Sequence, residues 1–110
     1  MNKKHIGASV FEDINRWEKD PAFKQAVKEH VEKAKLAQML KEVRGKENLS
    51  QLQLADKAKV SQSVIARIET GSSRTLPRLD LFNKILHSVG YETSIVATKK
   101  GSRIEVTLAA

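Results

Sequence analysis

The sequence predicts a mostly α-helical fold with a short β-hairpin near its C-terminal end. Three observations predict this class. Apolar residues recur at helical spacings over most of residues 10–90, Gly and Pro residues divide that stretch into segments, and strict apolar–polar alternation begins only after residue 90. The 110 residues are 40% hydrophobic and 30% charged, which fits one compact domain rather than a disordered chain.

The composition excludes several classes of site. The chain has no cysteine, so disulfide frameworks, thiolate metal sites and cysteine nucleophiles are excluded, and a reducing cytoplasm is compatible. No apolar run approaches the roughly 18 residues of a membrane span, and no apolar stretch follows the basic start as in a secretory signal. The net charge of +7 suits a polyanionic partner, although solvated surface charge would give the same number.

The N-terminal part is expected to be a flexible basic tail over residues 1–9 and a helical extension over residues 10–33. A short helix over residues 10–19 would place four apolar residues on one face, at spacings of three and four. These residues are Val10, Phe11, Ile14 and Trp17.

A longer helix is expected to follow. Asp20 suits its N-cap, and Pro21 suits its first turn, where the missing N–H costs nothing. The helical rhythm runs from Phe23 to about Arg44, either as one bent helix or as two, and Gly45 is expected to end it.

The main domain is expected over residues 34–90, with several short helices. Ser50 and Ser61 each precede a Gln and an apolar rhythm, which predicts two N-caps, and Gly71 should close the second of these helices.

Another helix is expected to open at Pro77 and to end at Gly90. Its candidate buried residues are Leu79, Leu81, Phe82, Ile85, Leu86 and Val89.

Residues 91–110 are expected to form a β-hairpin. Apolar residues alternate in two stretches, Tyr91, Ile95 and Ala97 in the first and Ile104, Val106 and Leu108 in the second. The segment between them supplies Gly101 for a turn. Because an isolated two-stranded hairpin is marginal in water, it should pack on the helices or pair with a second chain, and we expect it to be the dimerisation element.

The most informative stretch is LSQLQLADKAKVSQSVIARIETG, residues 49–71. It predicts two short helices joined by a tight turn, which is the geometry of a helix-turn-helix. Five residues are spaced to meet between the helices, with the small Ala55 at the closest approach. They are Leu54, Ala55, Val60, Ile65 and Ile68.

The outward residues of the second helix carry the chemistry of base recognition. Gln62 can bond adenine through two hydrogen bonds, Arg67 can bond guanine O6 and N7 in the same way, and Ser63 lies beside them. Free backbone N–H groups at this helix start, beside Ser61, favour a phosphate, and Gln51 holds the matching place one helix earlier. The alternative is that these are ordinary exposed polar residues of a small helical domain.

This stretch closely resembles the helix-turn-helix of XRE-type regulators, the group of lambda Cro and the phage repressors, over about residues 36–90. The resemblance implies a five-helix, lambda-repressor-like domain that binds a palindromic operator as a homodimer. The base-contacting positions fall on Gln62, Ser63 and Arg67, and the phosphate-binding Gln falls on Gln51. The resemblance also implies that the loop after the second helix meets the DNA backbone. The full expected DNA-binding set is Gln51, Ser61, Gln62, Ser63, Arg67, Arg74 and Arg78.

One residue departs from the pattern of that group. Lys59 stands where the group often has Gly, at a turn position that needs a positive φ. A Lys in the left-handed conformation costs about 1 kcal/mol, so the turn is expected to be strained or altered in shape.

The flanking segments are similar to those of HigA-type antitoxins of bacterial toxin–antitoxin pairs, which have a comparable helical lead with Asp-Pro and Phe and a β tail. This resemblance implies a RelE/HigB-like ribonuclease toxin as partner, repression of the protein's own operon, and a cytoplasmic, nucleoid-associated bacterial location. The expected toxin-binding residues are Phe11, Ile14, Trp17 and Phe23. The alternative function is a stand-alone repressor without a toxin. The alternative role of the N-terminal segment is only to support the long helix.

Catalysis is not expected. The three His residues are dispersed without ligand spacing, no Gly-rich phosphate loop is present, and no metal or cofactor site is expected. Glu69 lies at a helix end, where an acid is unfavourable, so it is expected to pair with a nearby Arg or Lys rather than to act as a base.

Overall fold

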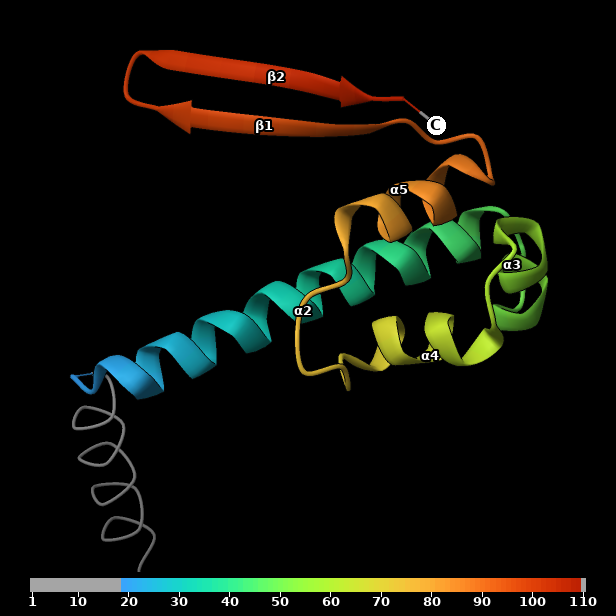
Figure 1. Cartoon of the computed structure of the whole chain (residues 1–110), viewed down its shortest axis with the longest axis horizontal. Helices are drawn as coiled ribbons and strands as arrows, with labels where there is room; N and C mark the ends of the chain where they lie inside the picture. Colours follow the sequence, from blue (N-terminus) through green and yellow to red (C-terminus); the bar gives the residue numbers. More distant parts are fainter. Residues whose placement is uncertain (1–18, 110) are drawn as a thin grey trace, which may run out of the picture. The chain divides into compact units, whose positions relative to one another are not determined.

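The structure, a computed structural model, describes residues 19–109. Within these residues, four helices precede two strands: α2 (Pro21–Lys46), α3 (Gln51–Ala58), α4 (Gln62–Thr70), α5 (Leu79–His87), β1 (Thr93–Lys99) and β2 (Ser102–Leu108) (Figure 1). The mostly helical class with a C-terminal hairpin is therefore confirmed. The expected count of five helices in the main domain is not confirmed, because residues 34–90 hold the end of α2 and then only α3, α4 and α5. No helix of the described residues is long and apolar enough to cross a membrane.

The long helix is continuous from Pro21 to Lys46. Asp20 caps it as expected, its Oδ1 accepting a hydrogen bond from the Ala22 N–H at 2.9 Å. Gly45 does not end the helix; the chain turns instead at Asn48, which has a φ of 55°. Asn tolerates this left-handed conformation, and the Leu49 N–H then bonds the Arg44 carbonyl oxygen at 3.0 Å.

The two short helices begin at the predicted serines, but the serines act differently. Ser50 forms a capping box, in which its Oγ accepts from the Gln53 N–H at 3.1 Å while Gln53 Oε1 accepts from the Ser50 N–H at 2.8 Å. Ser61 has the backbone conformation of an N-cap, but its hydroxyl lies 3.0 Å from the Ser63 hydroxyl and makes no cap bond. Gly71 ends α4 with a φ of 66°.

The last helix begins at Leu79, two residues later than Pro77 predicted, because Arg78 holds the N-cap position. Leu79 is 49% exposed, so the expectation that it is buried was wrong. The helix ends at His87, with Ser88 as its C-cap, earlier than the predicted end at Gly90. Gly90, with a φ of 90°, ends the turn that follows.

The core draws one fully buried side chain from each helix: Leu40 from α2, Leu54 from α3, Ile65 from α4 and Ile85 from α5. Of the residues predicted to meet between α3 and α4, Leu54, Ala55, Ile65 and Ile68 are buried and Val60 packs partly buried against them. This core belongs to the unit that begins at Lys33; residues up to Glu32 form a separate unit.

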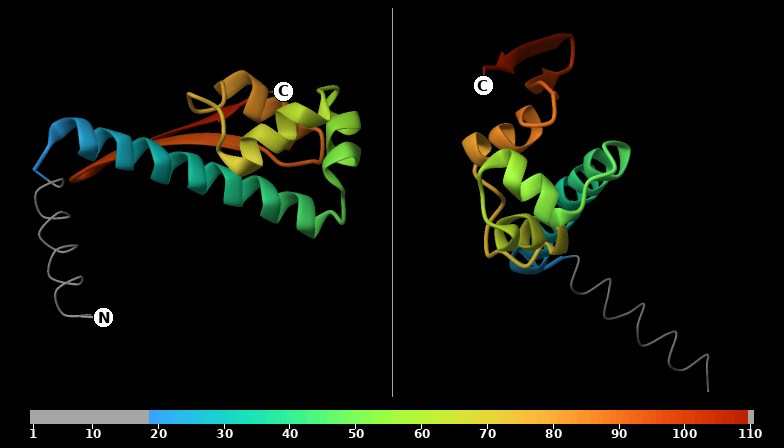
Figure 2. Two further views of the ribbon diagram at one scale, coloured as in Figure 1. Left: turned by 90° about the horizontal axis from the view of Figure 1, so that it is seen from below. Right: turned by 90° about the vertical axis from the view of Figure 1, so that its right-hand side faces the viewer.

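The hairpin extends beyond α5, on the side away from α4 (Figures 1 and 2). β1 and β2 pair antiparallel, with Thr93 opposite Leu108 and Lys99 opposite Ser102. A turn at residues 100–101 joins them, with Gly101 at a φ of 78°. The predicted hairpin and its turn are therefore confirmed.

Candidate nucleic-acid interface

One side of α4 is fixed in the core and the other side is free. Ile65 and Ile68 are buried, whereas Gln62, Ser63 and Arg67 are exposed. The structure therefore places the three expected base-contacting residues together on the outer face of one short, rigidly held helix. In the described part of the chain, no carboxylate forms an ion pair with Arg67, so its guanidinium is free to form the two hydrogen bonds that guanine offers.

The turn between α3 and α4 has the predicted backbone. Lys59 has a φ of 60° and a ψ of 40°, the left-handed conformation, and its own N–H bonds the Asp56 carbonyl oxygen at 3.3 Å. The next N–H, of Val60, bonds the Ala55 carbonyl oxygen at 3.0 Å. Ala55 is 1% exposed, so its small side chain does lie in the contact between the two helices.

A buried carboxylate links the recognition helix to the two helices before it. Glu69 is 3% exposed, and Arg44 of α2 donates two hydrogen bonds of 2.9 Å to its two oxygens. Gln51, the first residue of α3, donates a third bond of 3.2 Å to Glu69 Oε1. The expectation that Glu69 pairs with a basic residue is confirmed.

These bonds determine the charge of the pair. Burial would raise the pKa of the Glu69 carboxyl, but the hydrogen bonds from Arg44 and Gln51 and the charge of Arg44 outweigh burial and hold this pKa below its ordinary value of 4.5. The hydrogen bond to Glu69 raises the pKa of Arg44 above its ordinary value, against a smaller lowering by burial. Both groups are therefore charged at neutral pH.

The network also orients Gln51, the expected phosphate contact. Because its amide nitrogen is bonded to Glu69, the side chain is held in one position before any DNA arrives. The sequence did not identify Arg44 as the partner of Glu69. An acid at the end of α4 indicates a basic partner, but it does not indicate which of the Arg and Lys residues this partner is.

The loop after α4 carries the two other expected arginines, and they differ. Arg74 is exposed, and its carbonyl oxygen accepts a 3.0 Å hydrogen bond from Lys33 Nζ of α2, which holds the loop. The Arg78 side chain is 82% exposed and forms a 2.9 Å ion pair with Asp80, whose side chain is 69% exposed. Lys33 is a positioning residue that the sequence did not reveal, because its partner is a backbone atom 41 residues away.

The expected toxin-binding residues are mostly not described. Phe11, Ile14 and Trp17, with the predicted helix around them, lie outside the described residues. Phe23 is in the first turns of α2 and is partly buried.

A family comparison agrees with this geometry. The model of a helix-turn-helix domain family matches residues 37–102, which is more than half of the chain and includes α3, α4 and α5. A search of the curated proteins found no match. The chain therefore belongs to the helix-turn-helix domain family and is a DNA-binding regulator of the XRE kind.

Proposed function

We propose that the protein is a transcriptional repressor that binds a palindromic operator as a homodimer and serves as the antitoxin of a RelE/HigB-like ribonuclease toxin. The DNA-binding part of this proposal depends on one observation. Gln62, Ser63 and Arg67 lie exposed on α4, while Ile65 and Ile68 fix the opposite side of the helix in the core. An α-helix presented in this way fits the major groove of B-DNA.

The experiment for DNA binding uses Arg67. Arg67→Ala should weaken binding to the operator by about 1–3 kcal/mol and relax the preference at one base pair, because only that base loses its partner. Binding measured across a library of operator variants distinguishes this result from a uniform loss, which would make Arg67 a phosphate contact instead. Lys57→Ala, at an exposed position of α3, is the matched control.

Repression of a single operon requires more sequence information than one helix supplies. Two recognition helices about 34 Å apart can contact successive turns of the major groove, which is why a two-fold operator is expected.

An exposed apolar stripe on α2 supports the toxin partner. Val27 and Val31 are 44% and 41% exposed, and together with Phe23 they follow one another at four-residue spacing, which places them on one helix face. Exposed aliphatic side chains in a row, with a partly buried aromatic one beside them, form a surface that a partner's groove can bind. The acidic residues Glu18 and Asp20, which precede this stripe in the sequence, would suit a basic, RNA-binding toxin.

The toxin proposal is tested with matched helix variants. Val27→Ala with Val31→Ala should abolish toxin binding while DNA affinity and melting temperature stay unchanged. Gln25→Ala with Glu29→Ala, on the opposite face of the same turns, should have no effect. Phe11→Ala with Trp17→Ala tests the preceding segment in the same assay. Loss of stability with toxin affinity preserved would show that the apolar residues serve only the fold, and absence of any neighbouring toxin gene would favour a stand-alone repressor.

A further inference from the structure

The two edges of the C-terminal hairpin differ in charge. From Thr93 to Thr98, β1 has no charged side chain, and this run of small and β-branched residues is exposed from Ser94 onward. β2 carries Arg103 and Glu105, 3.7 Å apart. Charged side chains on an edge strand prevent pairing with another chain, whereas an uncharged edge permits it.

The register identifies the backbone groups that are available on each edge. Lys99 and Ser102 flank the two-residue turn and are the first pair of the ladder that exchanges hydrogen bonds. Counting from this pair, every second pair exchanges hydrogen bonds and the pairs between them do not. Val96 and Glu105 form one of the pairs without mutual hydrogen bonds, and their N–H and C=O groups point outward from the hairpin. The side chains of such pairs lie closer, in agreement with the 3.1 Å between the hydroxyls of Ser94 and Thr107.

One face of the hairpin is apolar and mostly exposed. Ile95, Ala97, Ile104, Val106 and the partly buried Leu108 lie on this face. Ile95, Ile104 and Val106 are 42%, 66% and 54% exposed. A two-stranded ribbon with its apolar face in water is marginally stable, so additional strands would stabilise it.

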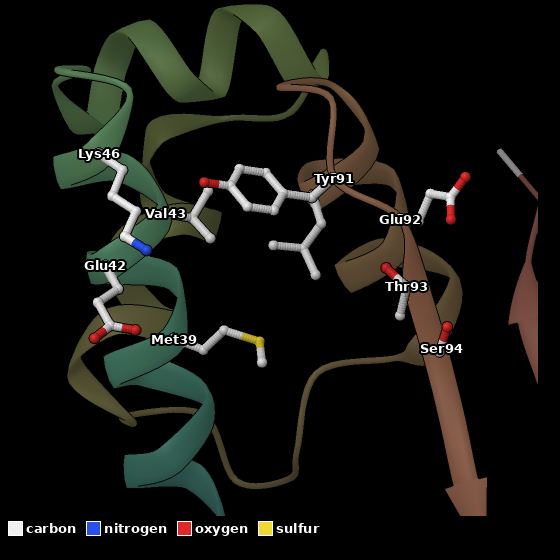
Figure 3. Close-up of a pocket in the computed structure, with 9 residues that line it drawn as sticks. Met39, Glu42, Val43, Lys46, Tyr91, Glu92, Thr93 and Ser94 are labelled. Carbon is white, nitrogen blue, oxygen red and sulfur yellow. The ribbon is translucent and has the colours of Figure 1, made fainter. Parts of the chain in front are cut away.

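A pocket lies beside the start of β1. Its volume is about 270 Å³, and Met39 and Val43 of α2 face Tyr91 and Thr93 across it (Figure 3). Thr93 Oγ1 is buried and has no hydrogen-bond partner among the described residues. The charged residues that line the pocket are two acids and one base, Glu42, Glu92 and Lys46.

We propose that β1 pairs antiparallel with β1 of a second copy, centred on Val96, so that the two hairpins form one four-stranded sheet. This inference rests on the proposed homodimer and names the strand and the register that form it. With Val96 opposite the partner's Val96, the whole strand Thr93–Lys99 is used, because residue 96 is its midpoint. Ile95 then lies opposite the partner's Ala97, a large side chain beside a small one.

The same register completes the pocket. Thr93 lies opposite the partner's Lys99, and in an antiparallel pair the two side chains lie on the same face of the sheet. The partner's Lys99 therefore lies on the same face as Thr93, beside a pocket whose lining acids outnumber its lining bases. The pocket is incomplete in one copy and is closed by a residue of the other.

Two proline variants at one position of the ladder test the strand assignment. Val96→Pro removes an outward N–H, so it leaves the hairpin's own hydrogen bonds intact but prevents pairing at the β1 edge. Glu105→Pro does the same on the opposite edge, at the residue directly across the ladder. In sedimentation experiments on the full chain, Val96→Pro should be monomeric and Glu105→Pro dimeric. A dimeric Val96→Pro would overturn the proposal.

Cysteine substitution tests the register, and it remains informative if both proline variants are monomeric. The chain has no cysteine, so Val96→Cys can cross-link only to itself in a partner. A hydrogen-bonded antiparallel pair separates its Cα atoms by about 5.5 Å, which a disulfide spans. Val96→Cys should form a covalent dimer on mild oxidation and Glu105→Cys should not; the reverse would overturn the proposal.

The partner's lysine is tested by Lys99→Met, which should weaken the dimer at least tenfold, whereas Lys100→Met in the turn should leave it unchanged. Equal effects of the two variants would remove Lys99 from the pocket. If the unmodified chain is monomeric at every concentration, the proposed homodimer itself fails. If that chain is dimeric and all variants remain so, only the strand assignment fails.

Discussion

Arg74 is exposed on the loop after α4, and Lys33 holds the backbone of that loop through the Arg74 carbonyl oxygen. A side chain presented in this way suits a phosphate rather than a base. Arg74→Ala should therefore weaken binding equally on all sequences and reduce the slope of log K against log salt by about one unit. Titrations at several salt concentrations measure this slope. The control is Arg103→Ala on the hairpin, and an unchanged slope for Arg74→Ala would remove this residue from the interface.

Lys59 keeps a left-handed backbone in the turn between α3 and α4. Because a side chain in this conformation costs about 1 kcal/mol, Lys59→Gly should raise the free energy of unfolding by up to that amount. Lys57→Gly, inside α3, should lower it by a similar amount, because glycine is unfavourable in a helix interior. Urea unfolding measures the free energy of unfolding of both variants. Destabilisation by Lys59→Gly would show that the Lys59 side chain makes a contact that stabilises the fold by more than the left-handed conformation costs.

At the scale of elements, the charge pair between α2 and α4 makes stability depend on pH. The pKa of Glu69 is lower in the folded chain than its ordinary value of 4.5. The pair therefore stabilises the fold fully above about pH 4.5, and this stabilisation is lost as the pH falls through the folded pKa. At pH 7, Glu69→Gln should lower the free energy of unfolding by about 2–4 kcal/mol, because it leaves Arg44 without its carboxylate.

Unfolding free energies of the unmodified chain and Glu69→Gln, measured from pH 7 to pH 3, should converge at the acid end. Glu47→Gln, at an exposed position, provides the control. A difference that stayed constant down to pH 3 would show that the stabilisation comes from packing rather than from charge.

Features that depend on neighbouring residues were predictable from the sequence, and those that depend on distant partners were not. The Asp20 cap, the Ser50 cap and the turn at Gly101 each involve residues only a few positions apart. Gly45 and Asn48 both tolerate the backbone that ends a helix, so sequence alone could not choose between them.

The candidate site divides in the same way. The exposed face with Gln62, Ser63 and Arg67 follows from helical periodicity and is confirmed, while its contact with DNA stays a prediction. The partner of Glu69 lies 25 residues away in α2, and the partner of Lys33 is a carbonyl oxygen. Neither pairing leaves a pattern in the sequence, because many other cations could pair with Glu69 and many other carbonyl oxygens could accept from Lys33.

At the scale of the whole molecule, the hairpin and the recognition helix have separate roles. The hairpin extends beyond α5 on the side away from α4, so its removal leaves the buried residues of α3 and α4 in place (Figure 2). Deletion of residues 91–110 should give a folded monomer that binds a full operator much more weakly but retains its affinity for a half-site. Sedimentation and binding to both DNA lengths measure this, and a truncated chain that remains dimeric would place the contact in the helices.

The carboxylate of Glu69 has one further consequence, for the way the fold opens. Its bonds run from α4 to the end of α2 and to the first residue of α3. Separation of α2 from α4 would leave a buried charge unpaired, and separation of α3 would break the hydrogen bond that Gln51 donates to that charge. The most protected backbone amides of these three helices should therefore exchange with deuterium at one common opening free energy, as a single cooperative unit. The outward amide of Val96 lies outside that unit. Because it would be hydrogen-bonded only when two copies pair, its exchange rate should depend on protein concentration instead.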